Sequence, residues 1–265
     1  MNVFLTGGTG FIGQHVAQCL DRHGHTRRTD LPYDVAIHLA WYVEPGKYLE
    51  SPLNDKCLAD SLALVKATNC RRWLVAGTSF EYASSDKPMR EDNPTGPRTR
   101  YARAKLDLFT ALQQLDIELV WPRLFYLYGP HEKQRRFVPI VINALLENRP
   151  APLTDGTEVR DFLHVEDVAD AMCAVAASKL TGVVNIGSGQ PVTIRQVAYQ
   201  IAEIIGRPEL LRFGEYTASA SDAPVVVADT TKLRSVWQPQ ISLPSGLRQT
   251  VEWWRQQHTP ATSTG

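Results

Sequence analysis

The chain has 265 residues, in which 28 Lys plus Arg balance 28 Asp plus Glu. Its 43% hydrophobic and 21% charged residues exclude a disordered, collagen-like or coiled-coil chain. No basic excess, apolar span of ~20 residues or signal-peptide pattern is present, so we expect a cytoplasmic protein without nucleic-acid or membrane partners. The four scattered cysteines are predicted to be buried free thiols: Cys19, Cys57, Cys70 and Cys173.

In the first half of the chain, short apolar runs alternate with segments that have the apolar periodicity of a helix. Residues 2–6 form an apolar run that Gly7 and Gly8 end, which predicts a buried strand and a sharp turn. Later segments predict strands at 34–40, 73–77 and 117–121, and helices at 11–23, 54–69 and 101–115. This alternation is typical of an α/β protein whose parallel sheet is covered by helices on both faces.

The second half is less regular. Its periodicity predicts helices at 139–148, 165–178 and 245–257, and a strand at 183–186. A further helix is predicted after Thr193, because Thr193 and Gln196 form a capping-box pattern and Gly206 follows as a stop signal.

A glycine-rich turn joins the first predicted strand to the first helix. Glycine recurs at positions 7, 10 and 13 within the stretch 6–13. In a dinucleotide-binding loop these glycines allow the turn, the approach of a pyrophosphate and close helix–sheet packing. The helix N-terminus then offers N–H groups and a partial positive charge to the phosphates. The strand–glycine–helix context therefore predicts binding of NAD or NADP.

The segment 25–33, between the first helix and the next main strand, is unusually short. Nine residues hold one poor strand or a plain connection, whereas a βαβ unit needs ~30. We expect either a sheet truncated at its adenosine-side edge or a sequence that omits a segment here. Asp30 is the candidate to grip the adenosine ribose of NAD, and Arg27 and Arg28 are candidates to meet the 2′-phosphate of NADP.

Tyr101 and Lys105 are spaced i, i+4 on a predicted helix, so they share one face. A lysine ammonium beside a phenol lowers the pKa of the tyrosine. Such a tyrosine exchanges a proton with a hydroxyl or carbonyl near neutral pH. With a dinucleotide loop upstream, this pair predicts acid–base chemistry rather than a solvated helix face.

Together with later stretches, these motifs resemble the extended short-chain dehydrogenase/reductase family, in its sugar-nucleotide epimerase/dehydratase group. The later stretches are 37–40, 128–130, 160–168, 185–189 and 246–250. The resemblance covers nearly the whole chain and departs mainly at 25–33. It implies a Rossmann-type doubly wound parallel sheet built from residues 1–129 and parts of 158–190. A smaller mixed α/β substrate-binding region would comprise 130–157 and 191–258, with a frayed tail at 259–265.

The resemblance also implies residue roles. Tyr101 resembles the catalytic acid/base, Lys105 the lysine that also holds the nicotinamide ribose, and Thr78 the catalytic Ser/Thr, with Ser79 as its alternative. The implied cofactor-binding residues are Gly7, Thr9, Gly10, Phe11, Ile12, Gly13, Leu39, Ala40, Tyr101 and Lys105. The implied substrate-binding residues are Thr78, Ser79, Tyr126, Arg136 and Arg160, of which Arg160 resembles the family's diphosphate-binding arginine. The spacing of the histidines predicts no metal site.

Departures from the family select among its reactions. Dehydratases of the group commonly carry Asp-Glu after the catalytic threonine, whereas this chain carries Ser79 and Phe80. Glu81 lies one position later and is expected to point to the opposite face of a strand. We therefore do not expect dehydration.

Two activities remain, with a nucleotide-diphosphate-linked sugar as the substrate. One is NAD(P)H-dependent reduction of the 4-keto group of a 6-deoxy sugar, and the other is 4-epimerisation with tightly bound NAD. Tyr126 replaces an asparagine frequent in epimerases, and Trp41 and Tyr42 add aromatic surface. An apolar pocket favours the ketoreductase, for which NADPH is slightly favoured.

A dinucleotide-binding sensor or scaffold without catalytic activity is the alternative from a different class, and the intact triad argues against it. The nucleotide base is unassigned, because the stretch 219–222 keeps Asp222 but lacks the arginine that the family often places three residues earlier. The helices predicted at 54–69 and 101–115 resemble those that pair in this family, so we expect a homodimer.

Overall fold

A parallel sheet forms the N-terminal part of the molecule and begins at β1, Asn2–Thr6. The structure is a computed structural model that describes residues 1–27, 32–217 and 223–258. Our expectations for Arg28, Asp30, the stretch 219–222 and the tail 259–265 concern residues outside these ranges.

The main sheet has the order β10-β6-β4-β3-β1-β2, with β5 also paired to β6, and all of its strand pairs are parallel. Its further strands are β2 (Thr26–Arg27), β3 (Val35–His38), β4 (Arg72–Val75), β5 (Gly77–Thr78), β6 (Glu118–Leu124) and β10 (Gly182–Ile186). Its helices are α1 (Phe11–Arg22), α2 (Leu53–Ala67), α3 (Arg100–Leu112) and α5 (Val165–Ala177).

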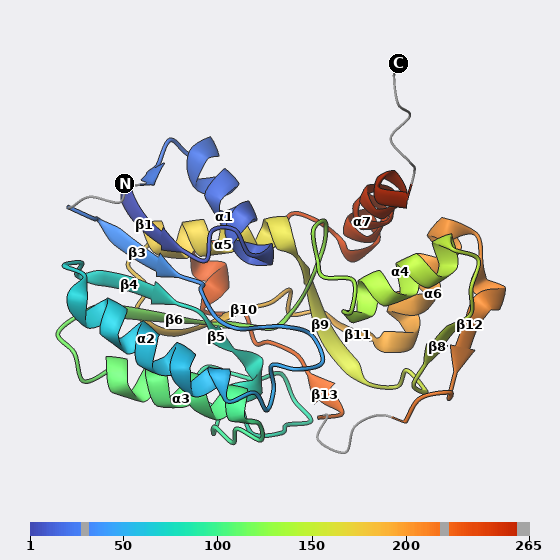
Figure 1. The fold of residues 1–265 in the computed structure, drawn as a ribbon, viewed down its shortest axis with the longest axis horizontal. Coiled ribbons are helices and arrows are strands. Elements are labelled where there is room, and N and C mark those ends of the chain that lie inside the picture. Colours follow the sequence, from blue (N-terminus) through green and yellow to red (C-terminus); the bar gives the residue numbers. More distant parts are fainter. Residues whose placement is uncertain (28–31, 218–222, 259–265) are drawn as a thin grey trace.

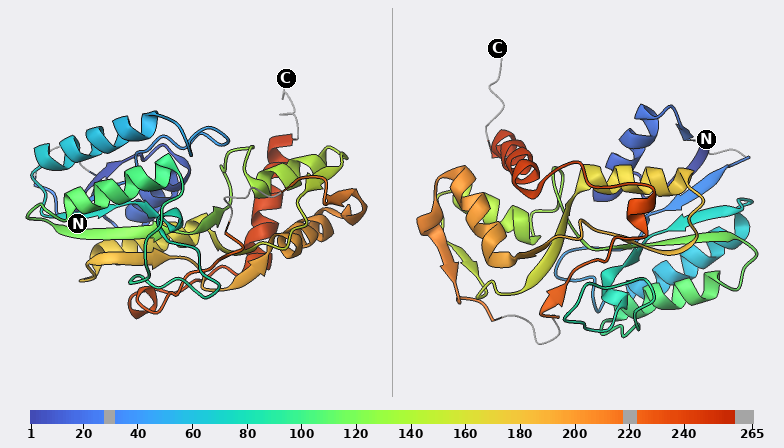
Figure 2. Two further views of the ribbon diagram at one scale, coloured as in Figure 1. Left: turned by 90° about the horizontal axis from the view of Figure 1, so that it is seen from below. Right: turned by 180° about the vertical axis from the view of Figure 1, so that it is seen from behind.

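Two apolar layers hold these helices on opposite faces of the sheet (Figures 1 and 2). Val16, Leu20 and Met172 bury the α1 and α5 side, while Leu108 and Trp121 belong to the core beneath α2 and α3. The predicted doubly wound parallel sheet is therefore confirmed. Most predicted elements differ from the observed ones only at their ends, as expected where local propensity gives way to packing.

The sheet is short on the side of β2. This two-residue strand pairs with β1 through Asn2 and Val3 and has no further strand beyond it among the described residues. Only residues 28–34 connect β2 to β3, which sits on the other side of β1. Of the two arrangements expected here, a poor strand or a plain connection, the structure shows the poor strand. The sheet edge is truncated in this chain, because so few residues cannot supply another helix and strand.

The C-terminal part has its own apolar core, formed mainly by α4 (Phe137–Leu146), α6 (Ile194–Ile205) and α7 (Leu243–His258). Its strands are β7 (Tyr126–Tyr128), β8 (Ala151–Leu153), β9 (Val159–His164), β11 (Pro191–Thr193), β12 (Leu211–Phe213) and β13 (Val225–Val226). Strand β9 pairs with β7, β11 and β13, and β8 pairs with β12. Short 3₁₀ turns occupy Ser79–Glu81, Pro208–Leu210 and Leu233–Ser235.

The start and end of α6 follow the sequence signals. Thr193 and Gln196 form the reciprocal capping box, and Gly206 ends the helix with a φ of 85°, in the left-handed region that glycine favours.

Of the cysteines, Cys19, Cys70 and Cys173 are buried free thiols as predicted, whereas Cys57 is half-buried. No helix within the described residues is long and apolar enough to cross a membrane.

Candidate active site

The glycine loop lies between β1 and α1 as predicted. Gly7 has a φ of 72°, and a Cβ there would lie 2.6 Å from the backbone nitrogen of Ala40. A Cβ on Gly13 would lie 1.9 Å from the carbonyl oxygen of Gly7. Glycine is therefore required at both positions, and the turn is pressed against the end of β3, where Leu39 and Ala40 follow.

The N-terminus of α1 is open to an anion. Its N-cap residue Gly10 offers no side-chain cap, and the first turn contains no acidic residue. The first N–H groups of a helix have no partner within the helix and carry a partial positive charge. The backbone of Phe11, Ile12 and Gly13 at this end therefore fits a dinucleotide pyrophosphate, as the sequence predicted.

The structure brings Thr78, Tyr101 and Lys105 together at the ends of β5 and α3. Thr99 caps α3 by accepting a hydrogen bond from the N–H of Ala102 at 3.2 Å, which fixes where the helix begins. Tyr101 and Lys105 then fall on its buried face, and Thr78 lies within hydrogen-bonding reach of the Tyr101 phenol. The Lys105 Nζ donates to the carbonyl oxygen of Ala76 at 2.7 Å.

Burial dominates the electrostatics of this group. It raises the pKa of Tyr101 above its ordinary value, although the hydrogen bond with Thr78 opposes the shift. It also lowers the pKa of Lys105 to about 7. The prediction that Lys105 lowers the pKa of Tyr101 is therefore wrong for the protein without a bound cofactor. Desolvation disfavours both the phenolate and the ammonium that the prediction required.

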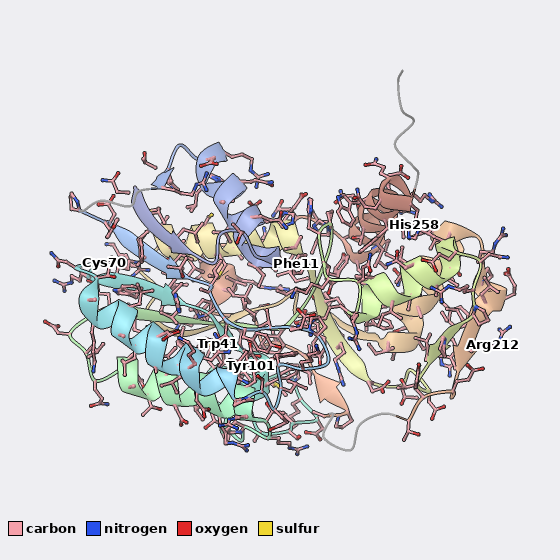
Figure 3. The ribbon with its side chains drawn as sticks, viewed as in Figure 1. Phe11, Trp41, Cys70, Tyr101, Arg212 and His258 are labelled. Atoms are coloured by element: carbon pink, nitrogen blue, oxygen red, sulfur yellow. The ribbon has the colours of Figure 1, made fainter. Side chains whose placement is uncertain are left out.

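Aromatic rings surround the Tyr101 phenol. Tyr48, Trp41 and Phe80 make edge contacts with its ring at centroid distances of 5.0, 6.4 and 6.5 Å. The Lys105 Nζ also lies 3.8 Å from the centre of the Trp41 ring, a cation–π contact. Figure 3 shows Trp41 and Tyr101 close together, on the side of the N-terminal part that faces α4. The sequence pointed to Trp41 but missed Tyr48.

A small cavity of about 70 Å³ opens beside this group. Ser79, Phe80 and Tyr126, which the sequence singled out, line it together with Arg98, Met89 and Val226, which it missed. Phe80 and Tyr126 meet edge to face at 6.3 Å. In the sequence, only its position three residues before Tyr101 could have indicated that Arg98 lies near the site. The cavity walls are therefore largely aromatic and aliphatic, with one cation at the rim.

The two arginines predicted to bind substrate lie at different elements of the C-terminal part. Arg160 is buried on β9, donates to the carbonyl oxygen of Val159 at 2.9 Å and lies 5.2 Å from the Tyr126 ring centre. Arg136 precedes α4 and donates to the Tyr48 hydroxyl at 3.4 Å. Both therefore lie next to aromatic residues of the site.

The expectation that Glu81 lies on a strand is wrong. Residues Ser79–Glu81 form a 3₁₀ turn rather than a strand, and the Glu81 side chain is fully buried. Its carboxylate pairs with Arg123 of β6 at 2.8 Å. Glu81 does not line the cavity described above.

Comparison with known proteins decides the family. The profile of the NAD dependent epimerase/dehydratase family matches residues 27–187. The chain belongs to this family. A UDP-glucuronate 4-epimerase of Thermodesulfobacterium geofontis is 30% identical over 238 residues, covering 82% of this chain and 71% of the relative.

Other members of the epimerase/dehydratase family match at lower identity. UDP-glucuronic acid decarboxylase 1 of Xenopus tropicalis is 25% identical and covers 96% of this chain and 72% of its own length.

Solved structures of the family share the fold. MoeE5, in complex with UDP-glucose and NAD, superimposes with a TM-score of 0.81 at 27% identity, covering 98% of this chain and all of that chain. A UDP-N-acetylglucosamine 4-epimerase of Methanobrevibacter ruminantium M1 gives a TM-score of 0.85 at 22% identity, covering 97% and 98%. The Rossmann-type α/β fold of this chain is thus that of known epimerase/dehydratase enzymes.

Proposed function

We propose that this chain catalyses hydride transfer at C4 of a nucleotide-diphosphate sugar, with Tyr101 as the acid/base. The observation that carries the proposal is the junction of Thr78, Tyr101 and Lys105 next to an uncapped helix N-terminus behind a glycine loop. The names of the relatives, which act on UDP-sugars, support the substrate class. A sensor or scaffold would not need this triad.

The chemistry assigned to each residue follows from its position. A bound nicotinamide supplies or accepts the hydride, and the protein manages the accompanying proton. Because burial raises its pKa, Tyr101 is protonated at neutral pH and is suited to donate that proton to the C4 oxygen. The Thr78 hydroxyl steadies the same oxygen, and Lys105 orients the nicotinamide ribose.

We favour reduction of a 4-keto-6-deoxy sugar. Phe80 and Tyr126 give the cavity an apolar wall, against which a sugar 6-hydroxyl would lose hydration without a partner. The truncated edge beyond β2 points the same way, because a reductase must exchange its cofactor in every cycle and gains from weak adenosine contacts. Among the described residues that line the cavity there is no acid to perform an elimination of water, and Glu81 is buried outside it.

A 4-epimerase is the second candidate, favoured by the 30% identical UDP-glucuronate 4-epimerase. It would oxidise and re-reduce one carbon with NAD retained. One assay separates the two activities: the protein is mixed with a 4-keto-6-deoxy nucleotide sugar and NADH or NADPH, and the reduced-nicotinamide absorbance is followed. Net consumption supports the reductase. Interconversion of UDP-sugar C4 epimers without consumption supports the epimerase. If neither activity is detected, the proposed chemistry is wrong.

The sheet edge leads to a prediction about cofactor affinity. The pyrophosphate contacts come from the backbone near Gly7 and Gly13, whereas the adenosine side lacks a strand beyond β2 among the described residues. We therefore expect NAD to bind weakly, only several-fold tighter than nicotinamide mononucleotide, with little discrimination from NADP. Calorimetric titration of all three compounds measures this. Tight and selective binding of NAD or NADP would show instead that another pocket holds the adenosine.

The outer surfaces of α2 and α3 lead to a prediction about assembly. They form a groove lined by charged residues of both signs, among them Asp55, Arg103 and Asp107, with Leu58 between them. Such a surface is self-complementary about a two-fold axis, so we expect a homodimer through these helices. Light scattering at micromolar concentration should give twice the mass of 29.6 kDa. Ala59→Arg, on the exposed face of α2, should yield a monomer, whereas Tyr199→Arg on α6 should not.

A further inference from the structure

A buried ion pair lies directly behind the proposed catalytic threonine. The side chains of Glu81 and Arg123 are 0% and 3% exposed, and the Glu81 carboxylate oxygen is 2.8 Å from the Arg123 Nε. Hydride transfer at a sugar carbon does not itself require a buried carboxylate at this position. Burying two charges costs free energy that apolar residues of similar size would not cost, so the pair calls for a functional explanation.

The Glu81 carboxylate holds the backbone of Thr78. Its Oε1 accepts the N–H of Thr78 at 2.8 Å, while the Thr78 hydroxyl accepts the N–H of Phe80 at 3.3 Å. These two bonds form a reciprocal capping box around the 3₁₀ turn. A Cβ on Gly77 would lie 2.8 Å from Oε1 and 2.2 Å from the Trp121 Nε1, so the carboxylate packs tightly against the end of the strand. The Thr78 hydroxyl is thereby aimed at Tyr101.

The hydrogen bonds indicate that Glu81 is ionised. Both of its oxygens accept the Trp121 Nε1–H at 3.0 Å, in addition to the bonds from Thr78 and Arg123. All of these partners are donors, and a protonated carboxyl would need an acceptor that none of them provides. Burial raises the pKa of Glu81, but the Arg123 charge and the donated hydrogen bonds oppose that shift.

The charge of Glu81 reaches the proposed catalytic pair on α3. Burial lowers the pKa of Lys105 and raises that of Tyr101, and the Glu81 charge opposes the first shift and adds to the second. Other groups also face these two residues. Arg123 and Tyr82 stack at 4.2 Å next to Glu81, and the Cys57 thiol of α2 opposes the lowering of the Lys105 pKa. Tyr48 raises and Arg136 lowers the pKa of Tyr101, while burial and the Lys105 charge lower the pKa of His38 on β3. Among these groups Glu81 is the only carboxylate.

We infer that Glu81 is a positioning residue, whose buried carboxylate fixes Thr78 against Tyr101 and favours the charged form of Lys105. Arg123 balances the carboxylate so that it can remain ionised in the protein interior. This inference rests on the proposed function, in which the phenol and the ammonium act together. A purely structural pair would hold the turn without acting on the titration of α3.

The test is Glu81→Gln, which preserves shape and an acceptor for the Thr78 N–H but removes the charge. In protein labelled with ¹⁵N-lysine, NMR titration gives the midpoint for Lys105, assigned with a Lys105→Arg variant. Because a negative charge stabilises the ammonium, its removal should shift the midpoint about one unit to lower pH. The matched control is Glu118→Gln, which removes a carboxylate at the other end of β6, where it pairs with Arg71. It should leave the midpoint unchanged.

A second variant keeps the test valid if Glu81→Gln alone destabilises the protein. Glu81→Gln leaves Arg123 buried without its counter-charge, whereas Glu81→Gln with Arg123→Met leaves neither charge and should restore the melting temperature. The inference requires that the shifted midpoint persist in this double variant. If the midpoint of Lys105 is the same as in the wild type in a folded variant, the pair is structural only and the inference is wrong.

The NMR readout needs no substrate, so it separates this inference from the proposed function. If the reductase assay detects turnover, Glu81→Gln should lower kcat several-fold at neutral pH, because a lower Lys105 midpoint leaves a smaller fraction of the ammonium charged, with little change in the affinity for NAD. A shifted Lys105 midpoint without any turnover in the wild type would reject the proposed function and leave the electrostatic role intact. Turnover in the wild type with an unshifted Lys105 midpoint in the variant would support the proposed function and reject the electrostatic role of Glu81.

Discussion

Replacing Tyr101 with Phe should lower turnover about 10²–10⁴-fold, the usual contribution of a positioned general acid. The ring contacts with Tyr48, Trp41 and Phe80 would survive, because phenylalanine retains the aromatic ring. Only the proton donor is lost. Cofactor affinity should stay near normal, since the glycine loop and Lys105 are unchanged. Steady-state kinetics and a calorimetric NAD titration measure the two quantities.

The control for this variant is Tyr199→Phe, which removes an exposed phenol on α6, far along the chain from the triad. It should leave both turnover and NAD affinity at wild-type values. A Tyr101→Phe enzyme that turns over like the wild type would remove Tyr101 from the mechanism. Loss of NAD affinity in the same variant would point to a binding role instead.

Gly13→Ala should weaken cofactor binding strongly. The new Cβ would lie 1.9 Å from the Gly7 carbonyl oxygen and 2.8 Å from the Cα of Gly8. Since both are backbone atoms, the loop must move away from α1, and the N–H groups that face the pyrophosphate lose their arrangement. We expect at least a tenfold loss of NAD affinity and a destabilisation of about 1–3 kcal/mol, as for other overpacked sites.

Gly24→Ala, just beyond the other end of α1, is the matched control. A Cβ there meets nothing within 4 Å, although the φ of 67° costs about 1–2 kcal/mol in strain. Its melting temperature should therefore fall, while its NAD affinity stays unchanged. Equal losses of NAD affinity in the two variants would show that general destabilisation, not the loop, explains the Gly13 result.

Local sequence patterns were sufficient for the shape of the glycine loop. Glycine at 7, 10 and 13 between an apolar strand and an amphipathic helix specifies a turn that only glycine can form, so its role can be deduced without the rest of the fold. The spacing of Tyr101 and Lys105 likewise placed both on one helix face, as α3 confirms. The length of the segment 25–33 limited this edge to one poor strand or a plain connection, and β2 is the poor strand.

Contacts between segments distant in sequence decided the rest. Tyr48 reaches Tyr101 only because the loop before α2 folds over the start of α3, and Arg98 borders the cavity with Val226 of a strand more than a hundred residues later. The acid–base properties were also set by the tertiary structure, because burial raises the pKa of Tyr101 and lowers that of Lys105. The sequence by itself determined the parallel sheet, the glycine loop and the helix face that carries Tyr101 and Lys105. Only the folded protein decided how far each group is desolvated and which charge, that of Glu81, lies behind it, since both depend on side chains that separate elements bring together.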